Sequence, residues 1–307
     1  MNQALVLGAN GQDGSYLCEV LAHQGTKVLG VGKQPVSKYL RESDHFAYRQ
    51  LDLRRDNALG ELLQEVQPAS IYHLAAVHGS AGFRYEPVWG DALDVNIKAL
   101  HTALEYARKS DAQVRIFYPS SAKVFGAPLP ESIDITAPKK ATCLYSTSKI
   151  CAENLISYYR AHHKVFASIA YLFNHDSPRR PASYFLPRIA LALRKALAGE
   201  QHVETLNTLN FYCDWGSARE FMEFAALSLA ASGPQDFILA TGETLFARTF
   251  VADLFSSFEL DYKQFIAEKD PSQSSDKYMV DLQHTQDLFG KIPRVSADTV
   301  CKEIATS

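Results

Sequence analysis

The chain opens on Ala4-Leu-Val-Leu7, which runs directly into Gly8-Ala-Asn-Gly11-Gln-Asp-Gly14. A short apolar run of this kind is typical of a buried parallel strand, and the glycines predict a tight turn after it. Gly8 permits the turn, Gly11 lets backbone approach a pyrophosphate, and Gly14 lets the next helix pack close to the sheet. The residues that follow have helical apolar spacing. The stretch therefore predicts a dinucleotide-binding strand, turn and helix, with the phosphates at the helix N-terminus.

Further apolar runs predict the remaining strands. They are Lys27–Val31, a third strand ending at Leu51-Asp52-Leu53, Ile71–Ala76 and Arg115–Tyr118. Strands that alternate with helices to about residue 170 predict an α/β fold, a doubly wound parallel (Rossmann) sheet with helices on both faces. We expect residues 1–175 to form the cofactor-binding domain with the catalytic residues. Residues 176–307 should form mainly a smaller α/β substrate lobe, with about 237–258 either in that lobe or returning to the main domain.

Lys33 follows the second predicted strand directly. Enzymes that use NAD usually carry Asp or Glu at this place, where the acid binds the ribose hydroxyls. The chain has no acid there, and a lysine suits a 2′-phosphate. The sequence therefore favours NADP over NAD, although a solvated loop lysine would look the same.

Tyr145-Ser-Thr-Ser-Lys149 places a tyrosine and a lysine four residues apart, on one face of a predicted helix. Such a lysine can lower the pKa of the tyrosine through its charge. The phenol then becomes usable as a proton shuttle near neutral pH. The pair Ser120-Ser121 lies about two dozen residues upstream, at the end of the fifth predicted strand.

Together, the glycine turn and the Tyr145–Lys149 pair resemble the extended short-chain dehydrogenase/reductase family, which acts mostly on nucleotide-linked sugars. The resemblance implies a catalytic set of Ser121, Tyr145 and Lys149. Ser121 would bind a sugar oxygen, Tyr145 would be the general acid and base, and Lys149 would bind the nicotinamide ribose. The cofactor contacts expected in all are Gly8, Gly11, Gln12, Asp13, Gly14, Lys33, Asp52, Leu53, Leu74, Ala75, Ala76, Tyr145 and Lys149.

The second half of the chain resembles GDP-mannose 4,6-dehydratases in three ordered blocks. They are Phe173-Asn-His-Asp-Ser-Pro-Arg-Arg180, Asp214-Trp-Gly-Ser-Ala-Arg219, and Ile238-Leu-Ala-Thr-Gly242 with Arg248 after it. The resemblance implies that Asn174 and Arg180 lie at the sugar or its diphosphate. It implies that Arg219 contacts the diphosphate or the nucleotide ribose, and arginine suits this because its planar fork pairs with phosphate oxygens.

Ala122 and Lys123 depart from that resemblance. Sugar 4,6-dehydratases carry at least one acid at these two positions, where it helps to move a proton from C5 and to expel the C6 hydroxyl as water. Alanine cannot do this, and a lysine is cationic near pH 7 unless it is strongly desolvated. Lys123 would instead bind a substrate oxyanion or phosphate, or point to solvent.

These features predict an NAD(P)-dependent enzyme that exchanges a hydride at C4 of a nucleotide-diphosphate sugar, GDP-linked by resemblance. An epimerase or a 4-keto reductase needs only the Ser121, Tyr145 and Lys149 set. A dehydratase is the alternative and requires a replacement for the absent acid. A non-catalytic sugar-nucleotide or dinucleotide sensor on the same fold is the alternative from another class.

Composition sets the remaining expectations. The chain has 307 residues and a formal net charge of −3. Its overall charge therefore gives no electrostatic attraction to nucleic acid. No apolar run approaches the length of a membrane span, and the five cysteines lack metal-ligand spacing. We expect a cytoplasmic enzyme without a metal. The resemblance implies a homodimer through helices at roughly 92–109 and 144–162.

Overall fold

The computed structural model describes residues 3–80 and 82–307. The chain forms two compact units, and each unit draws on separate stretches of sequence. Unit 1 consists of Met1–Val124, Lys139–Leu172 and Met222–Phe237, and unit 2 of Phe125–Pro138, Phe173–Phe221 and Ile238–Ser307. A compact unit is not the same as an independently folding domain, so the expected division at 175/176 stays a prediction.

Unit 1 is built on a seven-stranded sheet with the strand order β11-β7-β5-β4-β1-β2-β3. The pairings of β1 with β2 and β4, of β2 with β3, and of β5 with β4 and β7 are all parallel. The chain runs outward from β1 and then returns to its other side, which is the doubly wound topology. The strands are β1 (Gln3–Leu7), β2 (Lys27–Gly32), β3 (Phe46–Gln50), β4 (Ser70–His73), β5 (Arg115–Ser121), β7 (Phe166–Leu172) and β11 (Asp236–Leu239), the last continuing into unit 2.

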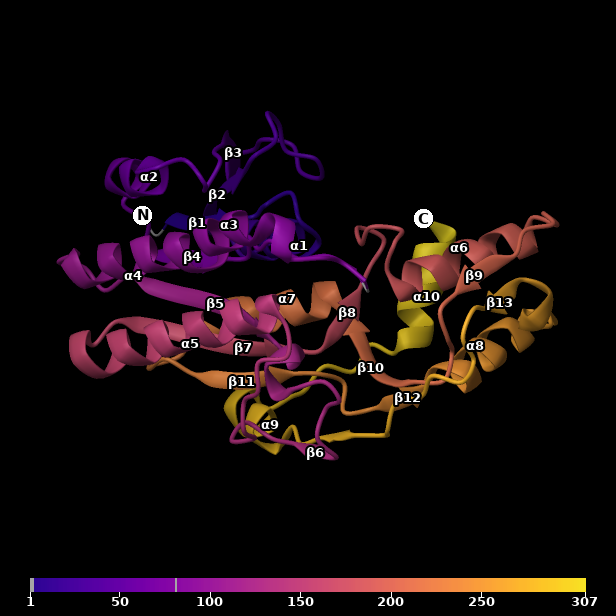
Figure 1. The fold of residues 1–307 in the computed structure, drawn as a ribbon. Helices are drawn as coiled ribbons and strands as arrows, with labels where there is room; N and C mark the ends of the chain where they lie inside the picture. The colour runs from indigo at the N-terminus through magenta and orange to yellow at the C-terminus, as the bar shows by residue number, and fades with distance from the viewer. Residues whose placement is uncertain (1–2, 81) are drawn as a thin grey trace. The chain divides into compact units, whose positions relative to one another are not determined.

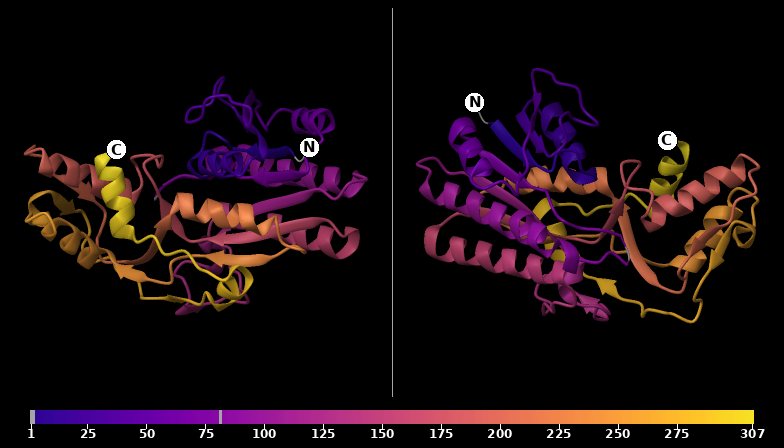
Figure 2. Two further views of the ribbon diagram at one scale, coloured as in Figure 1. Left: turned by 180° about the vertical axis from the view of Figure 1, so that it is seen from behind. Right: turned by 45° about the horizontal axis from the view of Figure 1, so that its top comes forward.

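Helices flank this sheet, as predicted for the fold class (Figure 1). Helices α4 and α5 lie side by side along it, and α5 lies alongside strand β7, as both views of Figure 2 show. A π-helical turn, Leu93–Lys98, interrupts the predicted helix that leads into α4, and such turns are frequent at functional sites. The helices are α1 (Gln12–His23), α2 (Ala58–Val66), α3 (Trp89–Ala92), α4 (Ala99–Lys109), α5 (Leu144–His163) and α7 (Ala218–Ser228), the last beginning in unit 2.

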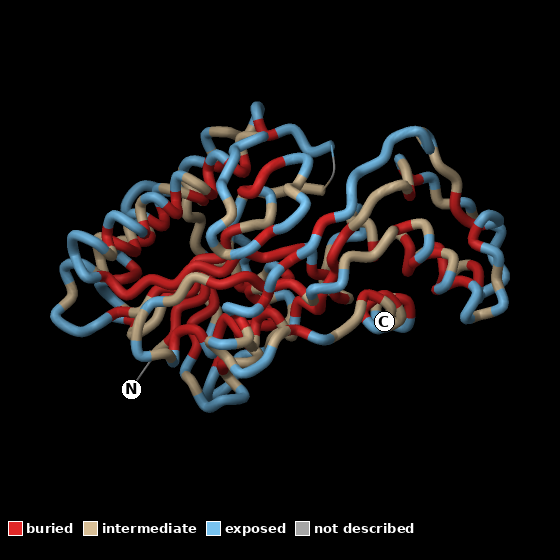
Figure 3. Tube along the Cα trace, turned by 90° about the horizontal axis from the view of Figure 1, so that it is seen from below, coloured by how far each residue is buried: buried red, intermediate tan, exposed pale blue. Residues whose placement is uncertain are grey.

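The central strands form the core of unit 1. Ala4–Leu7 is fully buried, and all seven residues of β7 are buried. Figure 3 shows these strands as the red interior beneath exposed loops. Burial on both faces explains why the strands appear in the sequence as continuous apolar runs rather than as alternating patterns. The predicted third strand ends earlier than expected, at Gln50, so Asp52 lies in the loop after it.

Unit 2 has three small sheets and its own core. The sheets are β12-β10-β8, β13-β9 and β14-β6. Trp215 lies in this core, where its ring stacks on Phe185 with centroids 5.1 Å apart. The strands are β6 (Ser132–Ile133), β8 (Asn174–Asp176), β9 (Glu204–Leu206), β10 (Tyr212–Ser217), β12 (Thr244–Phe246), β13 (Ile266–Glu268) and β14 (Met279–Val280). The helices are α6 (Phe185–Leu197), α8 (Ala247–Ser256), α9 (Gln283–Phe289) and α10 (Ala297–Thr306).

None of the helices in the described part of the chain is long and apolar enough to cross a membrane.

Candidate functional site

The glycine turn between β1 and α1 leaves no room for side chains. A Cβ atom on Gly8 would lie 2.7 Å from the backbone nitrogen of Ala75, and Gly8 has a φ of +91°. A Cβ atom on Gly14 would lie 2.1 Å from the carbonyl oxygen of Gly8. Helix α1 begins immediately after Gly11, so its unpaired backbone N–H groups face the turn. The turn therefore has the form of a phosphate cradle.

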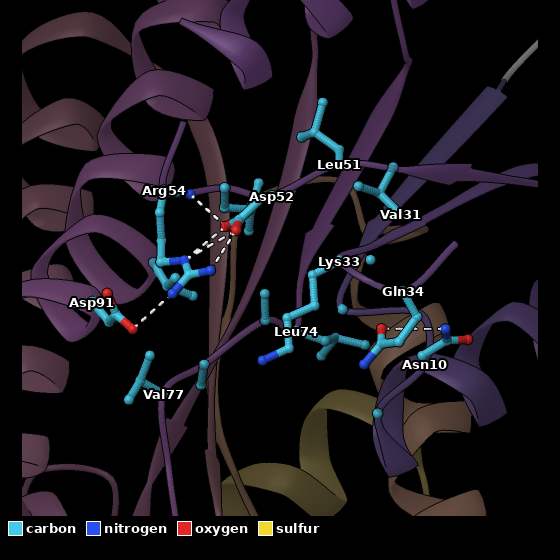
Figure 4. A pocket seen from close by; sticks show the side chains of 17 residues that line it. Asn10, Val31, Lys33, Gln34, Leu51, Asp52, Arg54, Leu74, Val77 and Asp91 are labelled. Atoms are coloured by element: carbon cyan, nitrogen blue, oxygen red, sulfur yellow. Dashed lines mark hydrogen bonds and ion pairs between the residues drawn. The ribbon is translucent and has the colours of Figure 1, made fainter. Parts of the chain in front are cut away.

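A cavity of about 310 Å³ opens beside this turn (Figure 4). It lies at the carboxyl ends of β1, β2 and β4, where doubly wound sheets bind their ligands. Lys33, Asp52, Leu53 and the Leu74–Ala76 segment all line it, together with Gly8 and Gly11. The structure thus brings most of the predicted cofactor contacts to one cavity of unit 1.

Arg54 is a lining residue that the sequence reasoning missed. Its Nε donates to Asp52 Oδ1 at 2.9 Å, and its Nη1 lies 3.0 Å from Asp91 Oδ2. Figure 4 shows this Asp52–Arg54–Asp91 chain at one end of the cavity. The hydrogen bonds from Arg54 lower the pKa of Asp52 to about 2. Asp52 is therefore ionised at neutral pH and is oriented by Arg54. No local sequence pattern predicted this role of Arg54.

Asn10 holds the loop that carries Lys33. Its Nδ2 donates to the carbonyl oxygen of Val36 at 2.9 Å and to the hydroxyl of Tyr48 at 3.1 Å. Its Oδ1 accepts from the backbone N–H of Lys38 at 2.8 Å. A residue of the glycine turn thus fixes the loop after β2, and the exposed side chain of Lys33 lies at the cavity beside it.

Tyr145 and Lys149 lie together on the buried face of α5. The Lys149 Nζ is 5.6 Å from the centroid of the Tyr145 ring and donates to the carbonyl oxygen of Pro119 at 2.6 Å. Ser121, two residues after Pro119, ends strand β5. Its hydroxyl oxygen accepts from the backbone N–H of Lys123 at 3.3 Å. The strand that carries Ser121 therefore also positions Lys149.

Burial controls the charge of Lys149. It lowers the lysine pKa to about 7, while the charges of Glu153 and Asp13 oppose that shift. Asp13 itself accepts a hydrogen bond from Gln12 at 3.0 Å. The two predicted cofactor contacts at the start of α1 are therefore bound to each other. Burial, and then the charge of Lys149, lower the pKa of His73 to about 4. His73 is therefore neutral at pH 7, and the pKa of Lys149 lies well below its ordinary value.

Glu153 is a second residue that the sequence reasoning missed. Its side chain is 3% exposed, and its carboxylate accepts from the hydroxyl of Ser120 and pairs with Lys139 Nζ at 2.7 Å. The hydroxyl of Tyr171 lies 3.4 Å from the same carboxylate. Glu153 follows Lys149 by one helical turn, as Lys149 follows Tyr145. This repeated spacing on one face was the signal that could have found it.

Asn96 is a buried polar residue that connects two segments of unit 1. Its Oδ1 accepts from the backbone N–H of Val77 at 2.9 Å, and its Nδ2 donates to Ser148 Oγ at 3.1 Å. It lies in the π-helical turn. It therefore joins the segment after β4 to the helix that carries Tyr145 and Lys149.

Lys123, at a position where the resemblance implies an acid, lies beside Tyr145. Lys123 is in the short 3₁₀ turn Ala122–Phe125 after β5, and its Nζ is 5.7 Å from the centroid of the Tyr145 ring. The same lysine lines a second cavity of about 400 Å³, together with Arg84 and Glu86. A lysine, and not the acid that the resemblance implies, therefore lies next to the tyrosine.

The predicted substrate residues Asn174, Arg180 and Arg219 all lie in unit 2. Asn174, at the start of β8, is exposed and donates to Cys213 Sγ at 2.7 Å. Arg180 Nε is 3.2 Å from Asp176 Oδ1, and its guanidinium lies 3.7 Å from the centroid of the Tyr184 ring. Arg219 is exposed in the first turn of α7.

Two of the matching sequence blocks bind each other. The buried carboxylate of Asp214 accepts from the N–H of Thr241 at 2.9 Å, from its hydroxyl at 2.9 Å, and from the N–H of Gly242 at 2.8 Å. Burial raises the pKa of Asp214 to about 6 against these hydrogen bonds. The Asp214-Trp215 block therefore connects β10 to the turn after β11.

Arg248 is also engaged inside unit 2. Its Nη1 is 2.7 Å from Glu268 Oε1, and its Nη2 donates to Asn210 Oδ1 at 2.8 Å. Glu268 in turn accepts from the backbone N–H of Leu209 at 2.6 Å. This arginine, which the resemblance singled out, therefore ties α8 to β13 and the loop before β10.

Comparison with known proteins agrees with this arrangement. The family model described as GDP-mannose 4,6 dehydratase matches residues 5–299. GDP-mannose 4,6 dehydratase 2 of Caenorhabditis elegans is 30% identical over 264 residues, which cover 80% of this chain and 68% of that protein. The human GDP-mannose 4,6 dehydratase is 29% identical over 267 residues, covering 83% of this chain and 72% of the human protein.

Solved structures with less than 25% identity share the fold. A UDP-glucose 4-epimerase of Thermotoga maritima superposes with a TM-score of 0.82 at 17% identity, covering 99% of this chain and 97% of the epimerase. A dTDP-glucose 4,6-dehydratase of Bacillus anthracis gives 0.82 at 16% identity, covering 100% and 96%. The glycine cradle, the Tyr145–Lys149 pair and the family model over residues 5–299 lead to one conclusion: the chain belongs to the GDP-mannose 4,6 dehydratase family.

Proposed function

We propose that the protein is an NAD(P)-dependent enzyme that exchanges a hydride at C4 of a nucleotide-diphosphate sugar, most simply a GDP-linked hexose. The observation that carries the proposal is the buried Tyr145–Lys149 pair, in which Lys149 is held by the carbonyl oxygen of Pro119. An ammonium group beside a phenol favours its ionised form, which can take the proton from a sugar hydroxyl. The names of the relatives support the GDP-linked substrate.

The cavity at the glycine turn fits a dinucleotide. Gly8 and Gly14 leave the backbone clear for a pyrophosphate, and Asp52, held by Arg54, offers an acceptor to the adenosine end. When bound, a nicotinamide group supplies reversible hydride acceptance. Solved neighbours such as WbmH of Bordetella bronchiseptica are described in complex with NAD⁺, which supports a pyridine nucleotide.

NADP is the proposed form of the cofactor, and NAD is the alternative. Lys33 lines the cavity at the end of β2, and no acid lies at residues 32–34. Binding of NADPH and NADH, followed by fluorescence, decides between them. Lys33→Glu should weaken NADPH binding by about tenfold, the worth of one charge-assisted hydrogen bond. Lys38→Glu is the matched control, because Lys38 lies in the same loop but does not line the cavity. Equal losses in both variants would speak for a general charge effect.

The roles of the catalytic residues follow from their places. Tyr145 moves the proton on O4 of the sugar, and Lys149 stabilises the phenolate and binds the nicotinamide ribose. Ser121, at the end of β5, hydrogen-bonds the same sugar oxygen. Asn174, Arg180 and Arg219 are the proposed contacts of the sugar and its diphosphate, and Lys123 is a further substrate contact.

An epimerase or a 4-keto reductase is the proposed outcome of the hydride exchange. Both need only Ser121, Tyr145 and Lys149, whereas water loss needs a group that moves a proton at C5. Ala122 and Lys123 replace the acid that would do so. A dehydratase is the second candidate, because the family model and the relatives carry that name.

Mass spectrometry of GDP-mannose after incubation with the enzyme and NADP tests the proposal. A product lighter by one water would establish the dehydratase and exclude the epimerase or reductase as the main activity. A product of unchanged mass with altered C4 stereochemistry would establish the epimerase. If GDP-mannose is left unchanged, a 4-keto-6-deoxy sugar with NADPH tests the reductase. Failure of all three would favour the non-catalytic sensor. Turnover that survives Tyr145→Phe would instead mean that Tyr145 is not the catalytic acid and base.

The assembly and the location of the protein also remain proposals. A homodimer through α4 and α5 is consistent with Tyr158, which is 54% exposed on α5. Light scattering of the purified protein measures its mass directly. A cytoplasmic location fits the reduced cysteines expected from the sequence.

A further inference from the structure

A histidine that neither the sequence motifs nor the proposed roles include lies against the catalytic tyrosine. The rings of His78 and Tyr145 are stacked, with centroids 4.3 Å apart and an interplanar angle of 28°. The Nδ1 atom of His78 is 2.8 Å from the hydroxyl of Tyr85. The ring of Tyr85 in turn stacks on Tyr145, with centroids 5.8 Å apart. The three rings form one cluster, the His78–Tyr85–Tyr145 stack.

The backbone fixes this stack at the end of the cofactor cavity. His78 directly follows the Leu74–Val77 segment that lines the cavity. The N–H of Val77 is bound to Asn96, whose other end is bound to α5 through Ser148. Tyr85 and Tyr145 are 8% and 7% exposed. The imidazole is therefore held beside the tyrosine from two sides, through the neighbouring Val77 and through Tyr85.

Among the described residues, the charged side chains around Tyr145 do not supply a second group that accepts and returns a proton near neutral pH. Lys123, whose Nζ lies 5.7 Å from the centroid of the Tyr145 ring, is a cation in its ordinary state. The Nζ of Lys149, 5.6 Å from the same centroid, is bound to the carbonyl oxygen of Pro119. The carboxylate of Glu153 is buried and paired with Lys139. Histidine is the side chain whose ordinary proton affinity lies near neutrality, so it can both accept and return a proton there.

We propose that His78 is a second proton-transfer residue, which acts on the sugar carbon next to the one that Tyr145 serves. The inference rests on the proposed function, because a ketone at C4 is what makes the C5–H bond acidic. Nε2 takes the proton from C5, and the electron pair of that bond passes into the enolate at C4–O. In the tautomer that donates Nδ1–H to the Tyr85 hydroxyl, Nε2 is the base.

The proton then leaves the imidazolium in one of two balanced ways. It returns to C5, which restores the ketone and exchanges the hydrogen with solvent. Alternatively, it joins the hydroxyl departing from C6, so that water is released and a C5–C6 double bond forms. In the second case His78 performs the proton transfer that Ala122 and Lys123 cannot.

The test supplies the ketone directly and so does not depend on hydride transfer. A GDP-linked 4-keto-6-deoxyhexose is incubated with the protein in D₂O, and deuterium at C5 is followed by NMR against a sample without protein. We expect the protein to accelerate exchange at C5, and His78→Gln to lose about 10²-fold or more of that acceleration. His78→Phe keeps an aromatic ring for the stack but has no nitrogen, and should lose as much. His45→Gln, at an exposed histidine in the loop before β3, is the matched control and should exchange like the wild type.

Added imidazole should restore part of the exchange in His78→Ala, which a merely structural role for His78 would not produce. Circular dichroism confirms that each variant is folded. Exchange at the wild-type rate in a folded His78→Phe protein would overturn the inference. A wild-type protein that reduces the ketosugar with NADPH but does not exchange C5–H would also overturn the inference. The proposed function would stand in that case. If the wild type shows neither C5–H exchange nor hydride transfer, both the inference and the proposed function are overturned.

Discussion

Units 1 and 2 use the charged residues of their motifs in different ways. In unit 1, Lys33 and Asp52 line a cavity, and Lys149 lies beside Tyr145. In unit 2, Asp214 is bound to the backbone of Thr241 and Gly242. A sequence block can match a family because it holds the scaffold together, so similarity alone does not identify a ligand contact.

The same contrast separates arginines within unit 2. Arg248 pairs with Glu268 and donates to Asn210, whereas Arg219 is exposed in the first turn of α7. Both belong to, or directly follow, blocks that resemble GDP-mannose 4,6-dehydratases. The contacts of Arg248 therefore indicate a role in stability, and the role of Arg219 at the diphosphate stays a proposal.

Removing the phenol should have the largest effect and should be confined to the chemistry of unit 1. Tyr145→Phe deletes the group proposed to move the O4 proton, so kcat should fall by about 10²- to 10⁴-fold. Steady-state kinetics with the substrate identified by mass spectrometry measure it. Cofactor binding and the thermal midpoint should stay near the wild-type values. A fall in both would show instead that the ring mainly holds the fold.

Asp214→Ala should damage unit 2 through stability. The backbone N–H groups of Thr241 and Gly242 would lose their acceptor, and each unsatisfied buried donor costs about 1–3 kcal/mol. Urea denaturation should show a loss of about 3 kcal/mol. Native stability equal to the wild type would mean that another group takes over the acceptor role.

The carboxyl of Asp214 also gives a pH test. Its pKa is raised to about 6 in the folded state from an ordinary value of about 4, so the folded state binds more protons between these two pH values. Its contribution to stability is therefore present below pH 4 and is lost as the pH rises through 6. Asp214→Asn should remove this part of the pH dependence.

The two arginines provide a matched pair. Arg219→Ala should raise KM for the sugar nucleotide by about tenfold, the worth of one charge-assisted phosphate contact. Arg248→Ala should leave KM nearly unchanged and lower the free energy of unfolding by about 1 kcal/mol, because the Arg248–Glu268 pair is partly screened by solvent. The reverse pattern would contradict the division of roles between them.

Glu153→Gln should produce the smallest effect, a shift of the pH profile. The negative charge of Glu153 raises the pKa of Lys149, so its removal should lower that pKa from its value of about 7. Less Lys149 would then be protonated at pH 7, and the alkaline limb of kcat should move to lower pH. Tyr171→Phe is the control, because it removes a hydroxyl near Glu153 without changing the charge. A similar shift in both variants would point to loosened packing.

Local patterns were sufficient to predict part of this site. The strand, the glycines and the helix lie within one stretch, and Tyr145 and Lys149 lie within one helical turn. The α/β class and the family resemblance are confirmed. What the sequence hid depends on contacts between residues distant in the chain, such as Arg54 with Asp91. His78 was hidden for the same reason, since only folding places it on a tyrosine 67 residues away.

The chain crosses between the two units after residues 124, 138, 172, 221 and 237, and this limits how the gene can be rearranged. Strand β14, near the C-terminus, pairs with β6, which is encoded before the catalytic tyrosine. Recombination at a single point near the middle of the gene would therefore join a β6 from one parent to a β14 from another. Exchange of unit 2 between relatives would require several coordinated crossovers. Specificity in this architecture should therefore change more readily by point substitution than by shuffling of gene segments.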